Sequence, residues 1–262
     1  MRGPDSPYLR TPTKLARAMP TPQNPGLLSA ISRSWKENRA HHGFWTTVRS
    51  LAGKFWEFVR ESTPAQRRSR YGDAEFDWDH HVNTTGATVG WRDRLLGHFH
   101  SPYQPTEPAL FSEIMENLNI DFREFTFIDV GSGKGRVLLM AADYPFGRIL
   151  GVELLPALHQ VAQKNLRAYK SDSQRCFLVE AVYGDAREFV FPNEPLVLYL
   201  FNPLPESGLI DLMANLDRSL SQFSRTVYVV YHNPLLEHVL ADHPAFKKIG
   251  GTHQYSIFRS GG

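Results

Sequence analysis

The sequence has a single cysteine, Cys176, and lacks any long run of apolar residues. One cysteine excludes an intramolecular disulfide and any zinc or iron–sulfur site built from several cysteines. The longest apolar stretches, 137–142 and 196–201, are far shorter than the roughly 20 residues that a membrane-spanning helix needs. No apolar signal-peptide core follows Met1, so we expect a cytoplasmic protein rather than a secreted one. A chain of 262 residues, 42% of them hydrophobic, is long enough for one large globular domain with an extension.

The net charge of only +2 hides an asymmetry between the two ends of the chain. Residues 1–70 carry 13 lysines and arginines against 4 acidic residues, a balance of +9, which leaves −7 for residues 71–262. Six prolines fall within residues 1–26 and block regular structure, so we predict a disordered, proline-rich tail there. The two parts of the chain therefore need separate explanations.

A basic, aromatic helical extension is predicted over residues 27–70. Apolar residues recur there at steps of three and four, as in an amphipathic helix (Phe44, Val48, Leu51, Phe55 and Val59). Three interpretations remain open: the apolar stripe packs on the globular domain, it lies on an anionic membrane surface, or the basic face binds nucleic acid. The second would make the protein peripheral at a membrane.

Apolar segments alternate with helical patterns from residue 125 onward, which is typical of a parallel α/β sheet. We expect strands near 125–130, 148–152, 176–182, 195–201 and 226–231 and helices near 107–118, 135–143, 155–170, 206–220 and 234–241. Residues 246–249 and 255–259, joined by two glycines, predict a C-terminal antiparallel hairpin. Cys176 would begin the third buried strand as a small core residue.

The first strand ends in a glycine-rich loop that starts at Asp129 and has glycines at positions 131, 133 and 135. Glycines at this spacing let the backbone turn sharply after the strand and approach a ligand closely. Glu153 closes the second strand, where a carboxylate can accept hydrogen bonds from both ribose hydroxyls of a nucleoside. Asp185 follows the third strand, where it can bond an adenine amino group, and Asn202 follows the fourth. All four features fall at carboxyl ends of strands, where open α/β sheets bind ligands.

Two other nucleotide sites fit the loop less well. A phosphate-binding P-loop requires Ser or Thr directly after its lysine, but Gly135 follows Lys134. A dinucleotide site requires a third glycine where the sequence has Arg136. A nucleoside that carries an amino acid remains as the candidate ligand.

The stretch from about 101 to 259 resembles the class I S-adenosylmethionine-dependent methyltransferases. The loop from Asp129 looks like their first motif, residues 151–154 their second, 184–186 their third and 201–204 their fourth. The segment 101–106, followed by a predicted helix, resembles the donor loop of non-SET protein-lysine methyltransferases. The resemblance implies an α/β fold: a Rossmann-like seven-stranded sheet with helices on both faces and an antiparallel C-terminal hairpin.

The resemblance also implies the cofactor, S-adenosyl-L-methionine, and the residues around it. The expected cofactor-binding residues are Tyr103, Thr106, Asp129, Gly131, Ser132, Gly133, Gly135, Glu153, Leu154, Asp185, Ala186 and Asn202. Asn202 and Tyr103 are the expected catalytic residues, placed where the acceptor would meet the methyl group. A base for an amine acceptor has no distinctive signal, and its candidates are Tyr103, His98, His100 and residues 231–233.

The leading acceptor is a protein lysine amine, followed by a small molecule. Two rival classes stay open: a non-catalytic scaffold that works through its basic tail, and a nicotinamide-dependent oxidoreductase. We expect no metal, although residues 77–81 would bring acidic and histidine side chains to one face if they formed a strand. The predicted organisation is a tail (1–26), a helical extension (27–70), a cap and donor-loop segment that lies over the acceptor pocket (71–106) and a methyltransferase domain (107–262).

Overall fold

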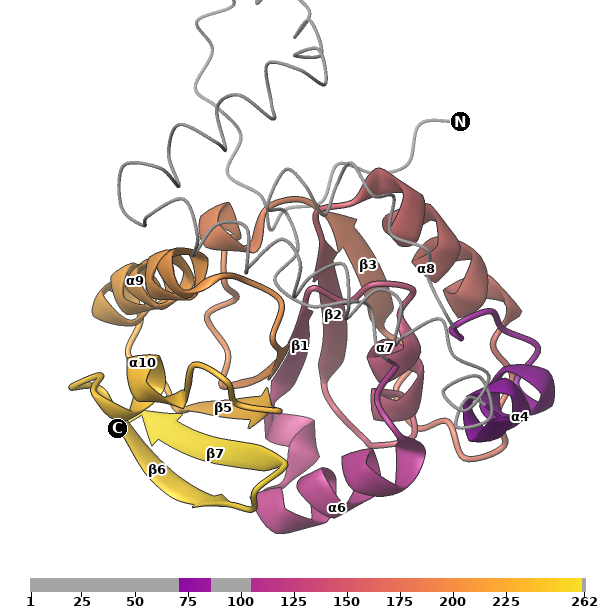
Figure 1. The fold of residues 1–262 in the computed structure, drawn as a ribbon, viewed down its shortest axis with the longest axis horizontal. Coiled ribbons are helices and arrows are strands. Elements are labelled where there is room, and N and C mark those ends of the chain that lie inside the picture. The colour runs from indigo at the N-terminus through magenta and orange to yellow at the C-terminus, as the bar shows by residue number, and fades with distance from the viewer. Residues whose placement is uncertain (1–70, 86–104, 261–262) are drawn as a thin grey trace, which may run out of the picture. The chain divides into compact units, whose positions relative to one another are not determined.

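The computed structural model describes residues 71–85 and 105–260. The tail and extension expected over residues 1–70, and Tyr103, His98 and His100, lie outside the described residues. The described helices are α4 (Tyr71–Asp79), α6 (Pro108–Leu118), α7 (Arg136–Ala141), α8 (Pro156–Ala168), α9 (Glu206–Gln222), α10 (Glu237–Ala241) and the short 3₁₀ turns η1 (Phe122–Glu124) and η2 (Ala186–Glu188) (Figure 1). The strands are β1 (Thr126–Val130), β2 (Arg148–Glu153), β3 (Val179–Tyr183), β4 (Leu196–Phe201), β5 (Val227–His232), β6 (Phe246–Gly251) and β7 (Tyr255–Ser260).

The seven strands form one sheet in the order β3-β2-β1-β4-β5-β7-β6. The first five strands in this order are parallel, and β7 runs antiparallel to both β5 and β6. The order reverses direction between β1 and β4, which leaves a crevice at the carboxyl ends of these strands. The predicted Rossmann-like sheet with an antiparallel C-terminal hairpin is confirmed, and its strand order is that of the class I methyltransferase fold.

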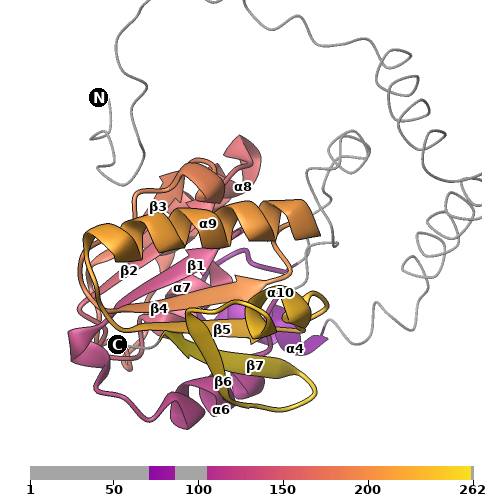
Figure 2. The same cartoon turned by 90° about the vertical axis from the view of Figure 1, so that its left-hand side faces the viewer.

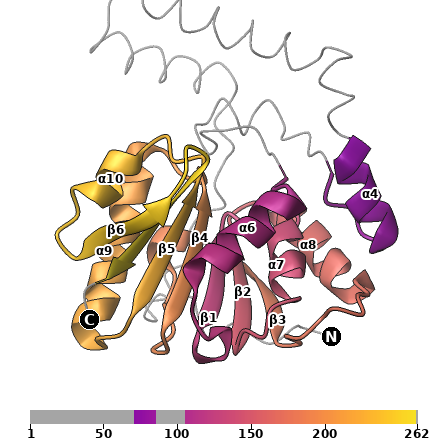
Figure 3. The ribbon, with the colours of Figure 1, turned by 90° about the horizontal axis from the view of Figure 1, so that it is seen from below.

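Helices cover both faces of the sheet, because successive residues of each buried strand point to opposite sides. On one face, Ile128 of β1 and Leu198 of β4 pack with apolar residues of α9 and α10. On the other face, Phe127 and Tyr199 pack with residues of α6, α7 and α8. Figures 2 and 3 show α9 and α6 on opposite sides of the strands.

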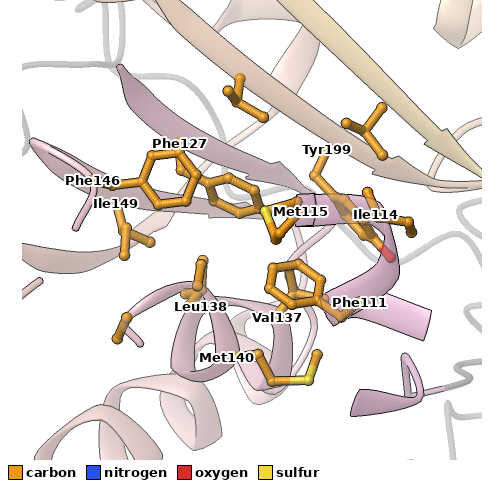
Figure 4. Packing of buried hydrophobic residues seen from close by; sticks show 14 of the residues in the cluster. Phe111, Ile114, Met115, Phe127, Val137, Leu138, Met140, Phe146, Ile149 and Tyr199 are labelled. Atoms are coloured by element: carbon orange, nitrogen blue, oxygen red, sulfur yellow. The ribbon is translucent and has the colours of Figure 1, made fainter. Parts of the chain in front are cut away.

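An aromatic cluster anchors α6 beneath the sheet. The ring of Phe111 on α6 lies 6.1 Å from that of Phe127 on β1 and 5.9 Å from that of Tyr199 on β4, both in edge-on geometry (Figure 4). All three side chains are almost fully buried. Because α6 directly follows Thr106, this packing fixes where the chain enters the crevice.

The third strand begins later than predicted, so the strand predicted over 176–182 is wrong at its start. The backbone amides of Arg175 and Cys176 both donate to the carbonyl of Ala142 at the end of α7. Pairing of β3 with β2 starts only at Val179. Cys176 is a buried core residue, as expected, but it lies before the strand and not in it.

Two further segments differ from their predicted form. The last helix begins at Glu237 rather than near 234, because Asn233 adopts a left-handed φ of 48° and residues 233–236 form a turn. Residues 77–79 end helix α4 and are not a strand. Among residues 71–85 and 105–260, no three His, Cys, Asp or Glu side chains gather as metal ligands. No helix in these same ranges is long and apolar enough to cross a membrane.

Candidate functional site

A pocket opens at the carboxyl ends of β1, β2, β3 and β4, and we call it the strand-end pocket. Its wall combines the glycine loop after β1, the end of β2, the start of η2 and the loop after β4. The structure brings together in this wall ten of the residues expected to bind the cofactor: Thr106, Asp129, Gly131, Ser132, Gly133, Glu153, Leu154, Asp185, Ala186 and Asn202. Gly135 is not among the lining residues.

The glycine loop needs its glycines for two different reasons. Gly131, Gly133 and Gly135 all have positive φ, between 54° and 85°, a region that strains other residues. Gly131 also lies against the loop after β4, where an added Cβ would come within 2.7 Å of the Pro203 Cβ. Gly135 instead lets α7 pack on α8, since its Cβ would lie 3.3 Å from that of Ala162.

Replacing Gly131 by alanine is expected to destabilise the folded protein. The new methyl group must push Pro203 away while the backbone keeps a strained φ of 75°. We expect a loss of roughly 1–3 kcal/mol in the free energy of unfolding, measured by urea denaturation. Gly250→Ala is the matched control, because no atom of the described residues lies within 4 Å of its added Cβ. Equal stability of Gly131→Ala and the unsubstituted protein would contradict this description of the loop.

Glu153 is the carboxylate that ties β2 to the glycine loop. One of its oxygens accepts from the Gly133 amide at 2.8 Å and the other from the Leu155 amide at 2.7 Å. Burial raises the pKa of Glu153, and these backbone hydrogen bonds partly offset that rise. A third backbone hydrogen bond, from the Leu154 amide, also reaches the carboxylate, which leaves part of its acceptor capacity for a ligand.

Asp129 is a buried carboxyl group at the floor of the pocket. Burial raises its pKa well above the usual range, and the nearby charge of Glu153 raises it further. Such a group favours a bound cation, whose charge would bring the carboxyl back to its ionised form. The wall is not wholly acidic, because the almost fully buried Arg136 also lines it.

Tyr199 is a pocket residue that the sequence analysis missed. It pairs with Asp129 in the parallel register of β1 and β4, and it is fully buried. Its hydroxyl lies 3.1 Å from the Thr106 Oγ1 and 2.7 Å from the His232 Nδ1. The available signal was a polar side chain on the same face as Asp129 within an otherwise apolar strand.

Asp185 begins the turn η2 and is already engaged. It caps η2 by accepting from the Arg187 amide at 2.9 Å, and its side chain forms an ion pair with the Arg187 guanidinium. Burial raises the pKa of Asp185, but the hydrogen bonds and charge of Arg187 outweigh it, and the net shift is downward. Asp185 is therefore a fixed, ionised acceptor at the rim of the pocket.

Asn202 is held rigidly at the end of β4. Its φ of 44° is left-handed, its Nδ2 donates to the Asn233 carbonyl at 2.6 Å, and its Oδ1 accepts from the Tyr231 hydroxyl at 2.9 Å. The carbonyl partner fixes which end of the amide is nitrogen. One N–H and one lone pair remain for a ligand.

The candidate bases differ in what they can do at neutral pH. Burial lowers the pKa of His232 to about 4, and its ring stacks on Phe201 with the centroids 3.9 Å apart. His232 is therefore neutral near pH 7 and a weak base. The Tyr231 hydroxyl is occupied with Asn202 and with the Leu236 amide, and burial raises its pKa.

The loop's lysine does not face the pocket. The Lys134 ammonium donates to the Asn83 Oδ1 at 2.8 Å and to the Thr85 carbonyl at 3.1 Å, outside the pocket wall. This is the opposite of a P-loop, in which the lysine reaches the phosphates. The Ser132 hydroxyl is buried against Gly151 of β2, and it has no hydrogen-bond partner among the described residues.

No protein-family model and no curated protein matches the chain. Among solved structures, an RNA methyltransferase from Salinibacter ruber in complex with S-adenosyl-L-homocysteine is 23% identical over 60% of this chain and 92% of its own, with a TM-score of 0.38. Precorrin-6y C5,15-methyltransferase from Geobacter metallireducens is 18% identical over 60% and 90%, with a TM-score of 0.43. Magnesium protoporphyrin IX methyltransferase from Synechocystis with bound SAM is 13% identical over 75% and 95%, with a TM-score of 0.42. The strand order of the sheet, β3-β2-β1-β4-β5-β7-β6, is by itself that of the class I methyltransferase fold.

Proposed function

We propose that this chain is a methyltransferase that uses S-adenosyl-L-methionine. The observation that carries the proposal is the convergence of three carboxyl groups on one pocket at the switch point of the sheet. The pocket offers acceptors for hydroxyl, amino and ammonium groups.

The residues of the pocket fit the parts of the cofactor. Glu153 would accept from the ribose hydroxyls with its remaining acceptor capacity, and Asp185 from the adenine amino group. Asp129 would face the ammonium of the methionine part. Gly131 and Gly133 allow the backbone to approach that part closely. Ala186 and Leu154 provide the amide and the apolar surface beside the adenine.

The cofactor supplies a methyl group on a positively charged sulfur, which is open to in-line attack. The chain's own contribution is to hold the two reactants in line and to exclude water. Asn202, fixed by Tyr231 and Asn233, presents one N–H and one lone pair toward an acceptor.

We propose a protein lysine amine as the acceptor. The proposal rests on the resemblance of the donor loop, of which Thr106 lines the pocket and contacts Tyr199. A small-molecule acceptor is the alternative. A lysine ammonium that loses its proton when it is buried becomes a neutral amine. Such an amine reacts without a strong base, which suits a site whose candidate bases are weak.

Methyl transfer tests the acceptor proposal directly. The purified chain is incubated with methyl-labelled S-adenosylmethionine and, in separate reactions, with a lysine-containing peptide library, the same library with acetylated lysines, and a mixture of small-molecule amines. Label on the free-lysine library alone supports a protein amine acceptor. Label on the small molecules alone overturns that acceptor and leaves the methyltransferase proposal in place. Glu153→Ala is the inactive control.

A further inference from the structure

Residues 76–85 dock on the outer side of the glycine loop, and we call this segment the N-terminal brace. Its residues do not line the strand-end pocket. Its turn is built around Asp77, whose carboxylate accepts from the amides of Thr84 and Thr85 at 2.7–2.9 Å and from the Thr84 hydroxyl. Thr84 is fully buried. The brace is therefore a preformed element and not a loose tail.

Asn165 on α8 joins the brace to the glycine loop. Its Nδ2 donates to the Lys134 carbonyl at 2.9 Å and to the Asn83 carbonyl at 3.0 Å, and its Oδ1 accepts from the Asn83 amide at 2.9 Å. The side chain is only 4% exposed. All the hydrogen-bonding capacity of this buried amide but one lone pair is thus used to hold the two backbones together.

Two side chains of the loop reach back to the brace. The Lys134 ammonium bonds Asn83 and Thr85, and the Arg136 guanidinium lies 4.6 Å from the centre of the Phe76 ring. Lys134 stands between Gly133, which lines the pocket and bonds Glu153, and Gly135, which starts α7. Lys134 and Arg136, on either side of Gly135, are thereby held by contacts with the brace.

We infer that docking of the brace and binding of the cofactor are coupled through Asn165 and Lys134, which act as positioning residues for the glycine loop. This inference rests on the proposed function. Glycines at positive φ leave the loop many conformations, and the brace selects the one in which the Gly133 amide meets Glu153. Coupling is reciprocal, so bound cofactor must also stabilise the brace.

The first test measures affinity on the full chain by calorimetry with S-adenosylhomocysteine. Asn165→Asp keeps the acceptor for the Asn83 amide but loses both donors, and Lys134→Met loses the ammonium. We expect each to raise Kd about tenfold or more, because buried carbonyls and the loop lose their partners. Asn117→Ala, which removes a bond to the Tyr255 hydroxyl between α6 and β7, is the control that leaves Kd unchanged.

The second test is hydrogen exchange with and without ligand. If Asn165 had only a structural role, binding of the ligand would not change the exchange rates of the brace amides. Saturating S-adenosylhomocysteine is expected to slow exchange of the Asn83, Thr84 and Thr85 amides severalfold in the unsubstituted chain, and this slowing is lost in Asn165→Asp. Unchanged Kd in both variants, or no slowing in the unsubstituted chain that binds the ligand, overturns the coupling while the proposed function stands. Failure of the unsubstituted chain to bind the ligand at all overturns both.

Discussion

Replacing Glu153 by glutamine is expected to weaken binding of S-adenosylhomocysteine roughly 10- to 150-fold, a loss of about 1.5–3 kcal/mol. Both carboxylate oxygens already accept a backbone N–H, from Gly133 and from Leu155. A glutamine amide has one oxygen only, so either orientation sets its NH₂ group against one of these donors. The substitution therefore removes an acceptor for a ribose hydroxyl, and it also displaces the glycine loop.

The measurement is calorimetry with Glu180→Gln as the matched control. Glu180 lies on the neighbouring strand β3, where it forms a partly exposed ion pair with Arg148 at 2.9 Å and is not a pocket residue. Its substitution is expected to leave Kd within about twofold, since exposed ion pairs contribute little. An unchanged Kd for Glu153→Gln would remove Glu153 from the site.

Replacing Asp129 by asparagine is expected to stabilise the empty protein at pH 7–8 while weakening its binding of the ligand. The pKa of Asp129 is raised by burial and by Glu153, so the folded state keeps a proton that the unfolded chain has already released. The contribution of Asp129 to the free energy of unfolding is therefore complete below the pKa of about 3.9 that the group has in the unfolded chain. It is lost as pH rises through the raised pKa of the folded state. Asparagine removes this loss, because it carries no charge at any pH.

Thermal melts from pH 4.5 to 8.5 measure this effect. The gain in Tm from Asp129→Asn is expected to grow with pH, at about 2–4 °C for each kcal/mol recovered in a domain of this size. Affinity for S-adenosylhomocysteine is expected to fall about tenfold or more, because the ammonium of the ligand loses its charged partner. Asp172→Asn, at an exposed loop position, is the control. Parallel pH curves for Asp129→Asn and the unsubstituted chain would contradict the burial argument.

Most of the sheet and the pocket wall were predictable from local patterns. Apolar runs separated by helical periodicity predict the parallel strands, since β1, β2, β4 and β5 are largely buried on both faces. Asp129, Glu153, Asp185 and Asn202 could be found because each follows directly on such a strand. The start of β3 could not be found this way, since Phe177 and Leu178 are apolar yet 77% and 66% exposed.

The parts that could not be predicted depend on contacts between distant segments. Asn165 looks like an ordinary polar residue of an amphipathic helix, but it is buried against residue 83, far away in the sequence. Lys134 stands in a glycine-rich loop, as the lysine of a phosphate-binding loop does, but its ammonium bonds Asn83 and Thr85 of the brace. The sequence shows Tyr199 only as a polar side chain in an apolar strand, and the register of β1 and β4 places it beside Asp129. For these three residues, sequence periodicity predicts the element in or near which each lies, but not the distant residue that it contacts.

Calorimetric titration of the full chain with S-adenosylhomocysteine, beside NAD and ATP, tests the central claim most directly. The strand-end pocket has three carboxyl groups, and the loop's lysine faces the brace, so we predict micromolar binding of S-adenosylhomocysteine and no binding of NAD or ATP. Binding of NAD without S-adenosylhomocysteine would favour a nicotinamide-dependent oxidoreductase. Binding of none of the three would contradict the methyltransferase proposal and favour a scaffold that has kept the fold without its ligand.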